Sequence, residues 1–167
     1  MESGSLPKSI DPERAAGQGL VVQGGLDPAP LARLRELVAG DAGPISVRLV
    51  FGRDEQGRGL MQGHAEASLP LLCQRCTDVF PFAVHTEWRL VFARSEADER
   101  ELAEKGIDVC YHSGPLDVAD VVEEELILAL PMAPRHPGDC EPIARPVAGT
   151  HPFAELAGLL KRPRRDI

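Results

Sequence analysis

The clearest chemical signal in the sequence is a pair of cysteines separated by two residues, Cys73 and Cys76. Such a pair can be half of a zinc site, a redox pair, or a coincidence of core packing. Farther along, "PRHPGDCE" supplies His136 and Cys140 at an H-x3-C spacing, within the range used by structural zinc sites. Thiolate and imidazole ligands suit tetrahedral zinc. The spacing therefore predicts one structural zinc held by Cys73, Cys76, His136 and Cys140.

Two other interpretations of these residues stay open. The cysteines could be small buried hydrophobes, with His136 an ordinary loop residue. A redox pair would need a position between a strand and a helix, where the helix N-terminus stabilises the thiolate. Here the pair lies between two strand-like segments, which counts against redox chemistry. Cys110 belongs to a separate apolar segment and is expected in the core.

The elements that must position the cluster are mainly strands. Apolar and polar residues alternate in segments 45–51, 60–72 and 80–92, and shorter strand signals fall at 6–10, 19–25 and 107–111. Short connections between consecutive strands favour antiparallel pairing. The expected fold class is α+β, with a mostly antiparallel sheet of about six strands, open or curled toward a barrel, and two or three packed helices.

Helices are expected in three places, and a fourth segment, residues 95–105, is charged and could be helix or loop. The first spans residues 31–40, with Asp27 as its cap. The second spans residues 117–130, with Asp117 as N-cap and Pro131 forcing its end. The third is a short helix that opens at Pro152. The expected domain organisation is one α+β domain over residues 1–150, followed by this helix and a basic tail over residues 151–167.

The acidic helix carries a carboxylate on its apolar face. On a helical wheel, Glu125 falls in the middle of the face formed by Val118, Val121, Val122 and Ala129. A carboxylate facing a core needs a partner, and arginine suits a bidentate pair. We therefore predict an ion pair between Glu125 and Arg75, or another arginine beneath the helix. A rotated or frayed helix would instead leave Glu125 in water.

Charge and hydropathy limit the classes of function. The formal net charge is −8, which argues against a domain that grips RNA with its whole surface and favours a basic protein partner or a merely solvated acidic surface. No apolar run reaches the length of a membrane span, and residues 1–10 lack the apolar core of a signal peptide. A cytoplasmic protein with reduced thiols is expected.

Six residues are candidates for binding a partner. Glu123 and Glu124 flank the apolar face of the acidic helix and could meet a basic protein. On the C-terminal helix, an apolar stripe must dock on its own domain or on a partner, and basic residues that could contact phosphate follow it. The plainer alternative is a docked terminal helix with a solubilising tail. The C-terminal candidates are Phe153, Leu156, Lys161 and Arg162.

Several stretches together resemble the YceD family, the large ribosomal RNA subunit accumulation proteins. They are "CQRC", "VEEELILALPMAPRHPGDC" and "HPFAELAGLLK", in matching order over most of the chain. The sequence departs from the family at His151, where such proteins usually carry Asn, and some members carry Cys at the position of His136, which can also bind zinc.

This resemblance implies a bacterial cytoplasmic protein that supports accumulation of 23S ribosomal RNA, with no established enzymatic activity. A ribosomal protein or large-subunit rRNA precursor is the expected partner, without a membrane or a small-molecule substrate. The sequence shows no nucleophile–base arrangement and no glycine-rich phosphate loop. A non-catalytic ribosome biogenesis factor is therefore the expected function. The alternative is a cysteine-based redox or metal-dependent enzyme.

Overall fold

The computed structural model describes residues 4–111, 114–138 and 140. In chain order the elements are β1 (Gly4–Ser5), β2 (Ser9–Ile10), α1 (Pro12–Gln18), β3 (Val21–Leu26), α2 (Ala32–Leu37), β4 (Ile45–Arg53), β5 (Gly59–Leu72), β6 (Val79–Phe92), α3 (Glu96–Glu104), β7 (Val109–Cys110), β8 (Leu116–Asp117) and α4 (Val118–Ala129). This confirms the predicted α+β class. Within the described residues, no helix is long and apolar enough to cross a membrane.

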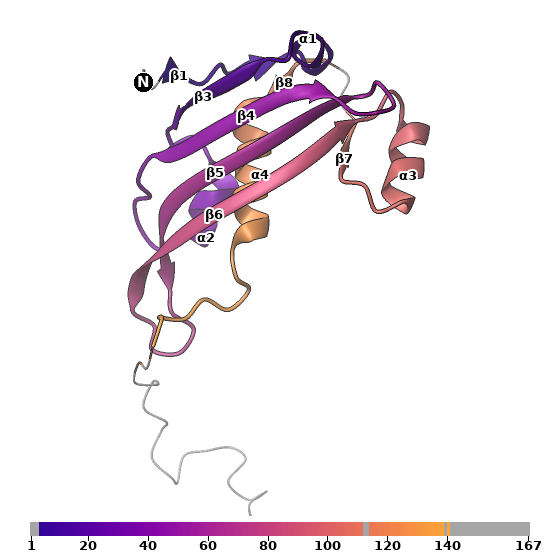
Figure 1. The fold of residues 1–167 in the computed structure, drawn as a ribbon. Helices are drawn as coiled ribbons and strands as arrows, with labels where there is room; N and C mark the ends of the chain where they lie inside the picture. The colour runs from indigo at the N-terminus through magenta and orange to yellow at the C-terminus, as the bar shows by residue number, and fades with distance from the viewer. Residues whose placement is uncertain (1–3, 112–113, 139, 141–167) are drawn as a thin grey trace, which may run out of the picture.

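One twisted sheet organises the molecule, in the order β1-β3-β4-β5-β6-β7. The three long strands β4, β5 and β6 form an antiparallel meander in its centre, and only the two-residue edge strands β1 and β7 pair in parallel. Strands β2 and β8 form a separate antiparallel pair. Helices α2 and α4 cover one face of the sheet, while α1 and α3 lie near one end of it (Figure 1).

The core lies between this sheet and α4. Alternation along β4 buries Ile45, Val47, Leu49 and Phe51 on the covered face, as the period of a half-buried strand requires. Helix α4 contributes Val118, Val122 and Leu126 to the same core. The sheet is open and no closed barrel forms, because its two edges are short strands at opposite ends of the order rather than partners of each other.

The acidic helix has the boundaries and the cap that the sequence predicts. The side chain of Asp117 accepts hydrogen bonds from the backbone N–H groups of Ala119 and Asp120, and the helix ends just before Pro131. The charged segment also resolves as a helix, α3, whose N-cap Ser95 accepts from the N–H of Asp98. The start of each helix can be read from its capping residue, because each cap lies within three residues of the N–H group that it accepts from.

Two N-terminal expectations were wrong. Helix α1 is not among the helices expected from the sequence; it begins at Pro12, with Asp11 accepting from the N–H of Arg14 and Gly19 adopting a left-handed C-cap with φ 60°. Asp27 does not cap α2: its carboxylate accepts from Ala29 in a local turn, and Leu31 occupies the N-cap without a side-chain hydrogen bond. The chain therefore carries four described helices rather than two or three.

Candidate functional site

The cysteine pair occupies the tight connection between β5 and β6, at the far end of the longest hairpin. The N–H of Cys73 donates to the carbonyl of Asp78, and the N–H of Thr77 donates back to the carbonyl of Cys73. Thr77 sits at φ 66°, a left-handed conformation that a residue other than glycine seldom adopts. This folded turn directs both cysteine side chains to one side of the hairpin tip.

The loop that follows α4 returns to the same tip, as Figure 1 shows. The N–H of Gln74 donates to the carbonyl of Pro134 at 2.8 Å, which fixes the loop beside the cysteine turn. The imidazole of His136 lies on the ring of Phe80, with 4.7 Å between ring centroids. These two contacts bring residues about sixty positions apart in the chain to the same place.

The four predicted ligands come together in the structure. Their donor atoms all lie within 4.8 Å of one another. Cys73 Sγ is 3.7 Å from Cys140 Sγ, and Cys76 Sγ is 3.4 Å from His136 Nδ1. Tetrahedral ligands at zinc–sulfur bonds of about 2.3 Å would place two sulfurs about 3.8 Å apart, and a sulfur and a nitrogen slightly closer. The cluster, comprising Cys73, Cys76, His136 and Cys140, could therefore bind a metal ion.

The electrostatics of the thiols are those of a pair that shares one proton. Burial raises the pKa of Cys73, but the backbone N–H groups of Cys76, His136 and Arg75 point at its sulfur and lower the pKa to about 5. At Cys76 the N–H of Asp78 lowers the pKa, while burial and the thiols of Cys73 and Cys140 outweigh it and raise the pKa to about 11. A metal cation would allow both sulfurs to be thiolates together.

The same N–H groups give Arg75 a role at the cluster. The backbone N–H of Arg75 is one of the three that stabilise the Cys73 thiolate. Cys73 is fully buried, while Cys76, His136 and Cys140 are half-buried. An amide-lined, water-poor pocket for sulfur favours a charged thiolate held by a metal over a thiol exposed for exchange.

The buried carboxylate of α4 is Glu123, and the expectation that Glu125 would take this position was wrong. Glu123 is 5% exposed, and its Oε1 accepts from the backbone N–H of Leu34 at 3.0 Å. Its Oε2 accepts from Arg33 Nε, also at 3.0 Å. Helix α2 packs on that flank of α4 and covers Glu123, which a wheel drawn for one helix cannot show.

Glu123 thereby caps α2 from another helix. Leu34 lies in the first turn of α2, where N–H groups lack helical partners, and the N-cap Leu31 offers no side-chain acceptor. Arg33 also bonds Glu124, whose side chain is half exposed. Within the described residues Glu125 forms no ion pair, with Arg75 or with any other arginine. Its pKa is raised by burial, with smaller contributions from Asp108 and Glu124.

Replacement of Glu123 by alanine is expected to lower the free energy of unfolding by about 2 kcal/mol, because the buried N–H of Leu34 loses its acceptor. Glu123→Gln keeps an acceptor and is expected to cost less. Glu124→Ala is the matched control and should stay within about 0.5 kcal/mol, as an exposed ion pair does. Urea unfolding of the three variants measures the difference; equal costs at the two alanine positions would contradict the cap.

The other candidate partner-binding residues are only partly placed. Glu124 is exposed on α4, whereas Glu123 is turned inward and is not available to a partner. Phe153, Leu156, Lys161 and Arg162 lie outside the described residues, as does the predicted boundary at residue 150. Arg33 and Leu34 were not identified from the sequence as partners of Glu123, because no local signal indicates them.

The fold and the cluster define a class: an open-sheet α+β protein whose central hairpin ends in a potential metal site of three cysteines and one histidine. Comparison with known families gives a match to the model described as large ribosomal RNA subunit accumulation protein YceD, over residues 61–160. The chain belongs to the YceD family.

A curated relative from Haemophilus influenzae (strain ATCC 51907 / DSM 11121 / KW20 / Rd) covers almost the whole chain. This protein, named large ribosomal RNA subunit accumulation protein YceD, is 30% identical over 174 residues, which span 97% of the present chain and 100% of the relative. No solved structure matches the chain. The family is named for RNA accumulation and not for an enzymatic activity, which agrees with the resemblance seen in the sequence.

Proposed function

We propose that the protein is a non-catalytic ribosome biogenesis factor of the bacterial cytoplasm that supports accumulation of 23S ribosomal RNA by binding a ribosomal protein. The observation that carries this proposal is membership of a family named for large ribosomal RNA accumulation. The net charge of −8 favours a ribosomal protein over the RNA itself as the direct partner, because phosphate would be repelled and the basic ribosomal proteins attracted.

We further propose that the cluster holds one structural zinc. The ion would join the hairpin tip to the loop after α4, adding to the Gln74–Pro134 hydrogen bond and the His136–Phe80 ring contact. Three thiolates and one imidazole would fill all four tetrahedral positions and leave none open for substrate. This supports a structural role and argues against the alternative of a metal-dependent enzyme. The burial of Cys73 argues in the same way against a redox pair.

The experiment is depletion of the protein in its own host, with the 23S to 16S rRNA ratio as the readout. Depletion is expected to lower the ratio, and a plasmid copy of the wild-type chain should restore it. A copy lacking Lys161–Ile167 tests whether the basic tail takes part: we expect weaker rescue with an unchanged melting temperature. A 23S to 16S ratio that stays constant through depletion would contradict the proposed function.

A further inference from the structure

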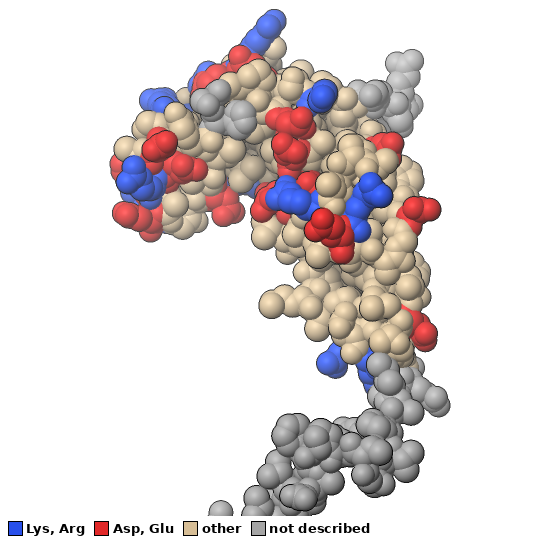
Figure 2. All heavy atoms as spheres, turned by 180° about the vertical axis from the view of Figure 1, so that it is seen from behind, with Lys and Arg blue, Asp and Glu red and all other residues tan. Residues whose placement is uncertain are grey.

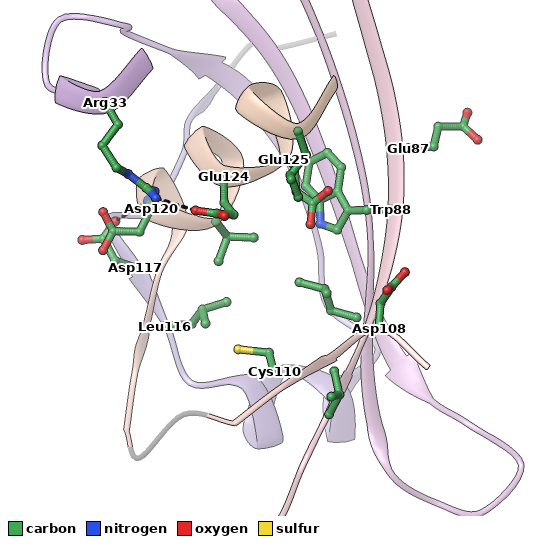
Figure 3. A pocket seen from close by; sticks show the side chains of 14 residues that line it. Arg33, Glu87, Trp88, Asp108, Cys110, Leu116, Asp117, Asp120, Glu124 and Glu125 are labelled. Carbon is green, nitrogen blue, oxygen red and sulfur yellow. Dashed lines mark hydrogen bonds and ion pairs between the residues drawn. The ribbon is translucent and has the colours of Figure 1, made fainter. Parts of the chain in front are cut away.

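A cavity of about 740 Å³ lies between α4 and the β6–β7 edge of the sheet, separate from the cysteine–histidine cluster. Trp88 and Leu90 from β6, Cys110 from β7 and Val121 from α4 form its apolar lining. Figure 3 shows the cavity open between two walls, one formed by α4 and β8 and the other by β6 and β7. We call this cavity the acidic groove.

Both walls of the acidic groove carry carboxylates. Asp117, Asp120, Glu124 and Glu125 line one wall, and Asp108 lies on the other. The carboxylate of Glu87 points away from the cavity, toward His64 of β5. Arg33 is the single cation among the lining residues, and its guanidinium is already engaged by Glu123 and Glu124. On this face of the molecule acidic side chains spread over the upper half, with Lys and Arg side chains between them (Figure 2).

Trp88 gives the groove an unsatisfied polar group as well as an apolar surface. The residue is 9% exposed, yet its indole Nε1 has no hydrogen-bond partner within the described part of the chain. The indole ring lines the groove, while Nε1 itself is buried. Nearby, Leu128 is a large apolar side chain left 70% exposed on the lining of the same groove.

The charged form of Glu125, which lines the same groove, is disfavoured by its surroundings. Burial raises the pKa of Glu125 first, and the like charges of Asp108 and Glu124 raise it further. A cationic group placed between these three carboxylates would relieve that repulsion. A lysine or arginine stem would at the same time cover Trp88, since such stems pack on apolar surface while the charged head bonds carboxylates.

We propose that the acidic groove binds a lysine- or arginine-rich segment of a basic protein, with an aliphatic side chain of that segment packed on Trp88 and Leu128. The proposal rests on the proposed function and specifies the surface that a ribosomal protein would use. Carboxylates on both sides of the apolar lining, Asp108 on one and Asp120, Glu124 and Glu125 on the other, suit a segment that carries basic residues on both sides of an apolar one. The same walls would repel a nucleic acid backbone.

The test uses the single tryptophan of the chain, which lies in the groove. The full chain is titrated at low salt with a 12-residue peptide of alternating lysine and leucine pairs, and Trp88 fluorescence is followed. A saturable change is expected for this peptide, weakened by added salt, and none for the same peptide with glutamate in place of lysine. An absence of saturable binding, equal binding of the glutamate peptide, or a saturable Trp88 response to an RNA oligonucleotide added alone would overturn the proposal.

Two triple variants separate the groove from net charge. Asp108→Asn, Asp120→Asn and Glu125→Gln together remove three charges from the groove walls. Glu36→Gln, Glu55→Gln and Glu104→Gln remove three exposed charges elsewhere. We expect the dissociation constant to rise at least about tenfold in the groove variant and less than about threefold in the control. Equal losses would mean attraction by net charge alone and would overturn the proposal.

Rescue of the depleted strain separates this inference from the proposed function. If the groove is the partner site, the groove variant should fail to restore the 23S to 16S rRNA ratio, and the control variant should restore it. Full rescue by a groove variant that no longer binds the peptide would overturn the groove and leave the proposed function intact. If depletion does not change the 23S to 16S rRNA ratio, the proposed function is overturned. The fluorescence titration would still show whether the groove binds the lysine peptide.

Discussion

Replacing Cys73 by serine is expected to abolish zinc binding and to lower the stability by about 4 kcal/mol, the linkage value for a ligand at about a thousand times its dissociation constant. For a domain of this size, that loss corresponds to a melting temperature lower by roughly 10 °C. Cys73 is fully buried and receives three backbone N–H groups, so serine would leave those donors around a poor metal ligand. Elemental analysis and a thermal melt of untagged, chelator-free protein measure both effects.

Cys110→Ser is the matched control for this prediction. This variant makes the same cysteine-to-serine substitution at a half-buried position of β7, outside the cluster. It should keep one zinc per chain and lose far less stability than Cys73→Ser. Wild-type protein with much less than one zinc per chain, or equal melting temperatures in the two variants, would contradict a structural zinc.

Replacing Gly63 by alanine is expected to cost about 3 kcal/mol and to change the fluorescence of the chain. Gly63 on β5 lies opposite Trp88 on β6, and the indole ring lies against its backbone. A Cβ atom added there would stand 2.0 Å from Trp88 Cε2 and 2.6 Å from Nε1, so the ring must leave its place. The displaced indole would also alter the acidic groove that it lines.

The control for this change is Gly52→Ala in the neighbouring strand β4. An added Cβ at Gly52 would meet nothing within 4 Å, and alanine there should be neutral or slightly stabilising. Urea unfolding followed by Trp88 emission compares the two variants. Gly63→Ala with the stability and the emission maximum of Gly52→Ala would show that the ring does not depend on this glycine.

The central strands and the cysteine–histidine cluster were predictable because their signals are short and local. Alternation along β4, β5 and β6 follows directly from a sheet with one covered face. The cluster was predictable from two paired spacings, since each pair is held by one turn or loop. The meeting of the two pairs was inferred from ligand chemistry, and the structure brings their donor atoms to within 4.8 Å.

The features that the sequence did not disclose depend on contacts between distant segments. Glu123 is buried only because α2 covers its flank of α4, and α2 in turn lacks a cap of its own. Helix α1 was missed because the residues it buries besides Pro12 are two alanines, Ala15 and Ala16, too small to mark an apolar stripe. Its Asp11 cap and Gly19 stop were nevertheless present in the sequence.

The acidic groove belongs to the same group of unpredicted features. Its walls come from β6, β7, β8 and α4, and its carboxylates were visible in the sequence only as a general negative charge. Trp88 lies within segment 80–92, whose alternation predicted a strand and nothing more. Its indole ring packs against Gly63 of the neighbouring strand, and this pairing depends on strand register.

The most direct test of the central claim, that the protein acts by binding a large-subunit component, is sedimentation of the tagged native chain from lysate through a sucrose gradient at low salt. We expect co-migration with precursors of the large subunit, and release of the chain as salt is raised, because the proposed contact joins an acidic surface to a basic partner. Recovery of the chain only at the top of the gradient at every salt concentration, while its depletion still lowers 23S rRNA, would contradict it.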